Sequence, residues 1–241
     1  HGVEVFSTGP VLLSGTTAAA NGDVGLNVQA GSGALITVAN ATVNGSKGIG
    51  LFVVGGSGVV VDKLTVKDAV GAGAMFRLAG PTMVSNSTIE ATWPRADGKF
   101  GDGIIVLSSD VTLQNTVVAK NARAGVLAMG CGDIGNSYGA RLTTKNLLAK
   151  CNAFAIDYEN GSGAWLTPCA TTAKAALVDN GGNFTSPECA PYPSNPNVFP
   201  FEWHTFSGEP SQDPAIAEYK CFGSICNWFA VATTWTTIKA V

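Results

Sequence analysis

The stretch Ile36-Thr37-Val38-Ala39-Asn40-Ala41-Thr42-Val43 decides the fold, because close copies of it recur along the first two thirds of the chain. In each copy two apolar residues stand two positions apart and a turn residue follows them. Another apolar residue lies three positions after the turn residue. The copies span residues 36–43, 59–66, 82–89, 111–118 and 142–149. This pattern predicts a short strand, a tight corner and a second strand in each copy.

A second short segment lies between successive copies. It begins with a small residue and continues with apolar residues at consecutive positions, as in Gly50-Leu51-Phe52-Val53-Val54. The final residues of three copies, Val43, Val66 and Ile89, are spaced 23 residues apart. A period in the low twenties, built from short strands without helical periodicity, predicts stacked coils of a β-solenoid.

One position of the repeat holds asparagine in most copies. Asn40, Asn86, Asn115 and Asn146 share it, and Lys63 replaces asparagine once. Asparagine accepts the left-handed backbone conformation of a tight corner, and its side-chain amide can bond to the amide of the next coil. We therefore expect an asparagine ladder along one corner of the solenoid.

Two later coils are longer than the others, which locates insertions at residues 93–102 and 131–139. Such insertions form loops on a solenoid and often lie on its binding face. Trp93 in the first and Tyr138 in the second are candidate side chains for stacking on a sugar ring.

The first insertion also contains the candidate catalytic residues Asp97, Lys99 and Asp102. Carboxylates at this spacing suit acid–base chemistry on a sugar, and they also suit Ca²⁺. A solvated, glycine-rich loop is the alternative interpretation. The sequence predicts no other cofactor and no further metal site.

The second segment is apolar on both sides of its predicted strand. The residues expected to point outward are Phe52, Val54, Met75, Ile105, Leu107, Leu127 and Met129. A sheet that is apolar on both faces is normally covered on both. We expect this outward row to be covered either by residues 165–241, or by a partner protein or a second copy of the chain.

All six cysteines lie in the second half of the chain, at Cys131, Cys151, Cys169, Cys189, Cys221 and Cys226. Their even number and the low lysine content favour disulfides, and hence an extracellular or cell-surface protein. Six cysteines allow 15 connectivities. The local expectations are Cys131 with Cys151 and Cys221 with Cys226.

Charge and hydropathy exclude two classes of partner. The net charge is −3, charged residues make up 13% of the chain, and no basic block occurs, so we expect no nucleic-acid partner. No run of about 18 apolar residues is present, so we expect no membrane span.

The repeat resembles the right-handed parallel β-helix proteins of the pectin-lyase-like superfamily, which include secreted right-handed β-helix repeat proteins. The resemblance covers about residues 1–164 and implies an all-β fold. Residues 165–241, rich in cysteine, proline and aromatic residues, are expected to form an irregular appendage that packs on or caps the β-helix.

The enzymes of that superfamily would imply polysaccharide lyase or hydrolase activity. The chain has neither the Trp-Ile-Asp-His-type stretch of pectate lyases nor the Asn-Thr-Asp, Asp-Asp, Gly-His-Gly and Arg-Ile-Lys set of polygalacturonases. No catalytic residue is therefore carried over from the family.

The leading hypothesis is a non-enzymatic structural or adhesive β-helix protein at the cell surface or secreted, such as a self-assembling filament subunit that forms homo-oligomers or binds another surface protein. The alternatives are a polysaccharide lyase or glycoside hydrolase working in a groove beside loops 93–102 and 131–139, and a carbohydrate-binding module.

Overall fold

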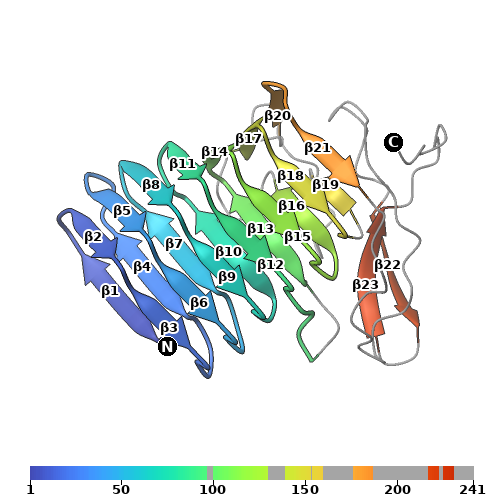
Figure 1. Ribbon diagram of the computed structural model, residues 1–241, viewed down its shortest axis with the longest axis horizontal. Helices are drawn as coiled ribbons and strands as arrows, with labels where there is room; N and C mark the ends of the chain where they lie inside the picture. The colour runs from blue at the N-terminus through green and yellow to red at the C-terminus, as the bar shows by residue number, and fades with distance from the viewer. Residues whose placement is uncertain are drawn as a thin grey trace.

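A computed structural model describes residues 1–96, 100–129, 139–152, 154–159, 176–186, 217–222 and 225–230. Three parallel sheets of seven strands dominate this part of the chain, and each sheet takes one strand from every coil. Figure 1 shows the coils stacked in sequence order along one axis. The predicted all-β parallel β-helix is confirmed, and the described ranges contain no helix that could cross a membrane.

The three sheets are called A, B and C in the order in which a coil passes through them. Sheet A contains β1 (Val3–Ser7), β4 (Leu26–Ala30), β7 (Leu51–Gly55), β10 (Ala72–Arg77), β13 (Asp102–Leu107), β16 (Ala124–Met129) and β19 (Phe154–Glu159). Sheet B contains β2 (Val11–Ser14), β5 (Leu35–Ala39), β8 (Gly58–Asp62), β11 (Thr82–Ser85), β14 (Asp110–Gln114), β17 (Arg141–Lys145) and β20 (Ala176–Asp179). Sheet C contains β3 (Thr17–Ala19), β6 (Thr42–Asn44), β9 (Thr65–Lys67), β12 (Thr88–Glu90), β15 (Val117–Ala119), β18 (Leu148–Lys150) and β21 (Phe184–Ser186).

Inward side chains form one continuous core along the stack. In sheet A, Leu26, Leu51, Ala74, Ile104 and Val126 are neighbours in register, and all five are buried. One coil alone would leave both sides of its inward residues open to water. Each coil therefore buries its apolar side chains against the coils before and after it.

The corner between sheets B and C carries the expected asparagine ladder. Asn115 Nδ2 donates to Asn86 Oδ1 at 3.4 Å, and Asn146 Nδ2 donates to Asn115 Oδ1 at 2.9 Å. All three residues have φ between 50° and 52°. Lys63 occupies the same position with φ 55°, and Asn86 Nδ2 donates instead to Asp62 Oδ1 at 2.7 Å. The predicted ladder is confirmed for these three asparagines.

A second polar ladder lies inside the corner between sheets C and A. Asn121 Nδ2 donates to Asn152 Oδ1 at 2.9 Å, and the backbone N–H of Thr92 donates to Asn121 Oδ1 at 3.1 Å. All three residues are buried. The repeat did not reveal this ladder, because the equivalent position changes residue type along the stack, from Asn21 through Ser46, Ala69 and Thr92 to Asn121. Buried amides in this ladder satisfy backbone groups that the turn leaves unpaired.

Glycine begins most strands of sheet A because the next coil comes too close for a side chain. A Cβ at Gly73 would overlap Ile89 Cγ2 and would lie 2.6 Å from the carbonyl oxygen of Gly103. A Cβ at Gly50 would likewise overlap the carbonyl oxygen of Gly73. The small residue of the second segment is therefore a steric requirement of coil stacking.

The β-helix extends past residue 164, the boundary that the repeat predicts. Strand β20 pairs with β17 in sheet B, and β21 pairs with β18 in sheet C, so the stack reaches Ser186. The repeat spacing did not predict the seventh coil, because 16 residues separate the end of β19 from the start of β20. Beyond it, β22 (Ala217–Phe222) and β23 (Ile225–Ala230) pair as an antiparallel hairpin.

The hairpin register pairs Cys221 with Cys226. The two cysteines therefore lie opposite each other, one on each strand of the hairpin. This backbone register is compatible with the expected Cys221–Cys226 disulfide. Cys151, buried after β18, is disulfide-bonded; Cys131, its expected partner, lies outside the described residues, as do Cys169 and Cys189.

We expect Asn115→Ala to destabilise the protein by about 2–3 kcal/mol, because it removes the amide that joins three coils and puts a Cβ-bearing residue without a polar group at φ 50°. Asn115→Gly removes only the amide and should cost about 1 kcal/mol. Urea unfolding measures both changes. Equal costs for the two variants would contradict a contribution from backbone strain.

We expect Gly73→Ala to cost at least 3 kcal/mol of unfolding free energy, because the added methyl group overlaps a core side chain and the next coil's backbone. Gly33→Ala is the matched control, since a Cβ there meets no atom within 4 Å. The control should change stability by less than about 1 kcal/mol. Thermal and urea unfolding compare them, and a Gly73→Ala variant as stable as the control would refute the steric account.

Candidate functional site

The outward side of sheet A, called face A, carries a second hydrophobic cluster centred on β13 and β16. The predicted outward residues do point away from the core, yet Ile105 and Leu127 are only 1% and 0% exposed. They pack with Ala72, Ala124 and Phe154, and with the partly buried Ile49, Met75, Phe100 and Met129. Phe52, Val54 and Leu107 of the same row are partly buried. Sheet A therefore has apolar clusters on both sides. Most of residues 165–241, one of the two expected covers of this row, lie outside the described residues.

A buried ion pair lies at the edge of this cluster. Arg123 Nε donates to Asp102 Oδ1 at 2.7 Å, and Arg123 Nη2 donates to Asp102 Oδ2 at 2.6 Å. The backbone N–H of Ala124 also donates to Asp102 Oδ1, at 3.1 Å. Both charged residues are buried. Asp102, one of the candidate catalytic residues, is thus held in a bidentate pair that joins the start of β13 to the turn before β16.

The described part of the first insertion packs on the β-helix. Phe100 joins the face A cluster, and Arg95 Cζ lies 5.9 Å from the centre of the Phe100 ring, within cation–π range. Trp93 Nε1 donates to the carboxylate of Asp68 at 3.3 Å, and the Trp93 backbone pairs with Val70. Trp93 is partly buried. These contacts hold the candidate stacking residue in one orientation.

Several predicted site residues lie outside the described residues. These are Asp97, Lys99 and Tyr138. The expected groupings of Asp102 with Asp97 and Lys99, and of Trp93 with Tyr138, therefore lie outside the described residues. Within the ranges that are described, no group of three or more histidine, cysteine, aspartate or glutamate side chains could hold a metal ion.

The outward side of sheet B, called face B, is open where face A is closed. Four of the five exposed large apolar side chains in the described residues lie on it, and these four are called the B strip: Leu12 (70% exposed), Leu35 (60%), Val60 (47%) and Met83 (37%). Leu12, Thr37, Val60 and Met83 are successive register partners on strands β2, β5, β8 and β11. The B strip therefore runs along the axis of the β-helix over four coils.

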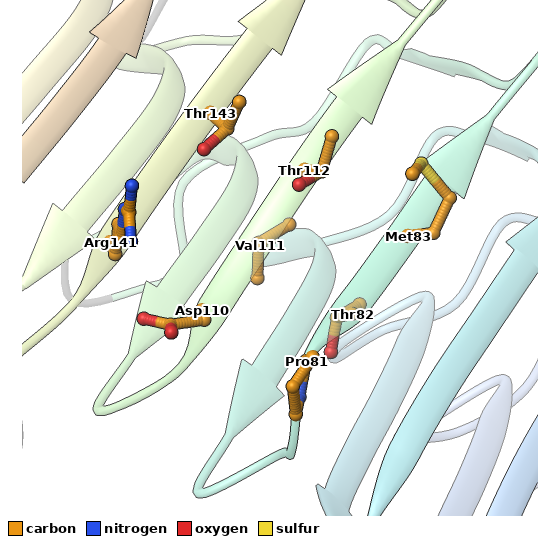
Figure 2. Close-up of a pocket in the computed structure, with 8 residues that line it drawn as sticks. All are labelled: Pro81, Thr82, Met83, Asp110, Val111, Thr112, Arg141 and Thr143. Atoms are coloured by element: carbon orange, nitrogen blue, oxygen red, sulfur yellow. The ribbon is translucent and has the colours of Figure 1, made fainter.

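Face B continues into a shallow hollow of about 260 Å³. The residues that line it are Pro81, Thr82, Met83, Asp110, Val111, Thr112, Arg141 and Thr143. Figure 2 shows two rows across β11, β14 and β17: Pro81, Asp110 and Arg141 in one, Met83, Thr112 and Thr143 in the other. The hollow exists because the short Thr112 and Thr143 side chains stand among longer neighbours.

Opposite charges stand side by side at the hollow. Asp110 and Arg141 are register partners on β14 and β17, and both are exposed. Within the described part of the chain, neither side chain takes part in an ion pair or side-chain hydrogen bond. Thr112 and Thr143 are also register partners, two residues further along the same strands. The hollow thus offers a carboxylate, a guanidinium and two hydroxyl groups to a ligand.

Asp62 carries a further carboxylate at the edge of face B. Its Oδ1 accepts hydrogen bonds from Asn86 Nδ2 at 2.7 Å and from Ser85 Oγ at 2.8 Å. These bonds, the one from Asn86 first, lower the pKa of Asp62 below its ordinary value. The group is therefore ionised at neutral pH and its acceptor positions are partly filled by the ladder corner.

Sequence reasoning missed face B as a candidate site. Its signal was present in the repeat, because the second position of each copy points outward and holds Val60 in one copy and Met83 in the next, where others have threonine. The hollow itself could not be read from one copy, since its lining comes from three successive coils.

Comparison with known proteins supports the fold. The family model described as right handed beta helix region matches residues 1–170, so the chain belongs to the right-handed β-helix family. No curated protein and no solved structure gives a match.

We expect Arg123→Met to destabilise the protein by about 3–5 kcal/mol, because it leaves the Asp102 carboxylate buried without its counter-charge. The double variant Asp102→Asn/Arg123→Met should recover at least half of this loss, since asparagine is neutral and its oxygen can still accept from the Ala124 N–H. Urea unfolding of both variants completes the comparison. A cost below about 1 kcal/mol for Arg123→Met would show that the pair is solvated.

Proposed function

We propose that this chain is a secreted or cell-surface β-helix protein with a structural or adhesive role, and that face B is its contact surface. The observation that carries the proposal is the B strip, a line of exposed apolar side chains on an otherwise rigid sheet. Apolar side chains that lie together on a surface favour contact with a partner, because the contact removes them from water.

The lower exposure of the predicted outward row on face A also supports face B as the contact surface. The predicted outward row is buried at Ile105 and Leu127 and partly buried at its other positions, so each of its side chains is less exposed than any member of the B strip. Face B has the additional advantage of a flat, regular geometry, since β2, β5, β8 and β11 are each paired residue by residue with the next. Side chains on such strands lose little freedom on binding.

The enzymatic alternative has less support from the described residues. Asp102 is the one candidate of its set that is described, and it is buried against Arg123 at hydrogen-bonding distance. A carboxylate that accepts hydrogen bonds from a buried guanidinium and a backbone N–H is a poor general base, because its acceptor positions are filled. The proposal accordingly assigns face B to binding and no bond-breaking step to the chain.

The occupant we propose for face B is an extracellular polymer surface. The B strip and the hollow share Met83 and together extend over coils one to six, so a long ligand can contact both. Assembly of the chain into filaments through the same face is the competing outcome. Light scattering separates the two, because self-assembly through the B strip would raise the mass in the absence of any polymer.

We expect the quadruple variant Leu12→Thr/Leu35→Thr/Val60→Thr/Met83→Thr to lose at least ten-fold in retention on insoluble cellulose, chitin or apolar latex, whichever retains the native protein, because it removes the exposed apolar area of face B. The variant should fold, since threonine already fills the row at Thr37, Thr112 and Thr143 and suits a strand. Co-sedimentation with each material measures retention.

The matched control is Val117→Thr/Leu148→Thr on sheet C, which extends the threonine column formed by Thr65 and Thr88. It should leave retention unchanged. Equal loss in the control, no retention of the native protein on any of the three materials, or a native protein that forms filaments through the B strip would each overturn the adhesive assignment of face B.

A further inference from the structure

The chemistry of the hollow selects a class of ligand. We propose that the hollow on face B binds one unit of a neutral carbohydrate chain whose neighbouring units lie along the B strip. This inference rests on the proposed adhesive function, because it names the ligand of the same face. Its evidence is the mixed lining of the hollow: Asp110, Arg141, the Thr112 and Thr143 hydroxyls, and the apolar edge formed by Pro81 and Met83.

The charges of the lining favour a neutral ligand. Asp110 contributes one negative charge and Arg141 one positive charge, so the formal charge of the hollow is zero. An anionic ligand that approaches Arg141 meets Asp110 on the adjacent strand, and a cationic ligand that approaches Asp110 meets Arg141. A ligand with neutral hydroxyl groups satisfies both, because a hydroxyl can donate to the carboxylate and accept from the guanidinium.

The spacing of the four polar groups matches a small ring that carries several hydroxyls. Asp110 and Arg141 are neighbours across one strand spacing, and Thr112 and Thr143 lie two residues further along the same strands. Strand geometry places these four Cα atoms at the corners of a parallelogram of about 5 Å by about 7 Å. A single sugar ring with its hydroxyl groups has a footprint on this scale.

Backbone pairing excludes recognition of a peptide by strand addition. Strand β14 is paired with β11 on one side and with β17 on the other, so the hollow lies on the face of a sheet and not at its edge. A peptide that adds as a strand needs free backbone donors and acceptors at an edge. A ligand in this hollow must be held by side chains alone, as a sugar is held through its hydroxyls and C–H surfaces.

The apolar edge of the hollow indicates in which direction along the β-helix the rest of a bound chain lies. Met83 and Pro81 border the hollow on the side of the preceding coils, Val60 continues the apolar row from Met83, and Leu12 lies in the same column beyond Thr37. The C–H surfaces of following sugar units can lie on this row. The hollow is smaller than the roughly 300–1,000 Å³ typical of enclosed ligand sites and is shallow, which suits one unit of a chain and not an isolated small molecule.

Calorimetric titration with soluble hexamers tests the inference directly. The neutral probes are cellohexaose, mannohexaose and N-acetylated chitohexaose, and the charged probes are hexagalacturonate and fully deacetylated chitohexaose. We expect the native chain to bind at least one neutral probe more tightly than either charged probe. Asp110→Asn and Arg141→Gln should each weaken that binding by about ten-fold, and Thr143→Val by less, because hydrogen bonds to charged groups are the stronger ones.

Thr65→Val on sheet C is the matched control, and its affinity should equal that of the native chain. Circular dichroism and thermal unfolding verify that each variant is folded. Tighter binding of hexagalacturonate, strengthened further by Asp110→Asn and abolished by Arg141→Gln, would replace the inference with an anion site. If Thr65→Val weakened hexamer binding as much as Asp110→Asn or Arg141→Gln, the hollow would not be the binding site.

The failures of the two proposals are distinguishable. If no hexamer binds while retention on a solid surface still depends on the B strip, the carbohydrate inference is overturned and the adhesive function stands. If a neutral hexamer binds through Asp110 and Arg141 while the B strip variant keeps full retention, the hollow is a sugar site and face B is not the adhesive surface.

Discussion

Parallel backbone pairing between successive coils is the constraint on which the rest of the structure depends. Strands of only three to six residues cannot bury a core by themselves, and each gains stability from the strand above and the strand below. The pairing also fixes the register residue by residue, from β1 to β19 in sheet A. A residue type that recurs at one coil position therefore becomes a continuous column in space.

Each column has its own physical reason. Apolar residues at the inward positions form the core, asparagines at the corner between sheets B and C form a ladder, and glycines before the strands of sheet A leave room for the next coil's carbonyl groups. The buried Asn121–Asn152 hydrogen bond forms a second ladder at the corner between sheets C and A. The corners are thus as specifically determined as the strands.

The sequence predicted those features that repeat from coil to coil with one residue type. The three-sheet stack could be inferred from the spacing of Val43, Val66 and Ile89, and the outer ladder from its asparagines. The ladder between sheets C and A could not be inferred, because the residue type at that position changes from coil to coil. The seventh coil could not be inferred either, because a long connection precedes β20.

The candidate site was predicted less well, for a related reason. Asp102 was predicted as a candidate catalytic residue, but its partner Arg123 comes from the next coil, and only the stacking brings the two together. The hollow depends on the relative lengths of side chains on β11, β14 and β17, a comparison across coils that one copy of the repeat does not contain.

Sheets B and C provide an internal comparison that bears on function. Over its first four coils the outward column of sheet C holds Thr17, Thr42, Thr65 and Thr88 in register, before Val117 and Leu148 continue it, and a Lys67–Glu90 ion pair at 2.6 Å lies beside it. The fold therefore does not need apolar residues in an outward column, because solvated β-branched polar residues also form these strands. Sheet B has the same geometry, yet exposes leucine at two positions and methionine at a third.

Strand propensity does not explain this difference, because leucine and methionine are weaker strand formers than the threonine that sheet C uses at equivalent positions. Core packing does not explain it either, since these side chains point away from the core and remain exposed. We therefore propose that the exposed apolar side chains beside the hollow contribute to binding, because the fold itself does not require them on face B.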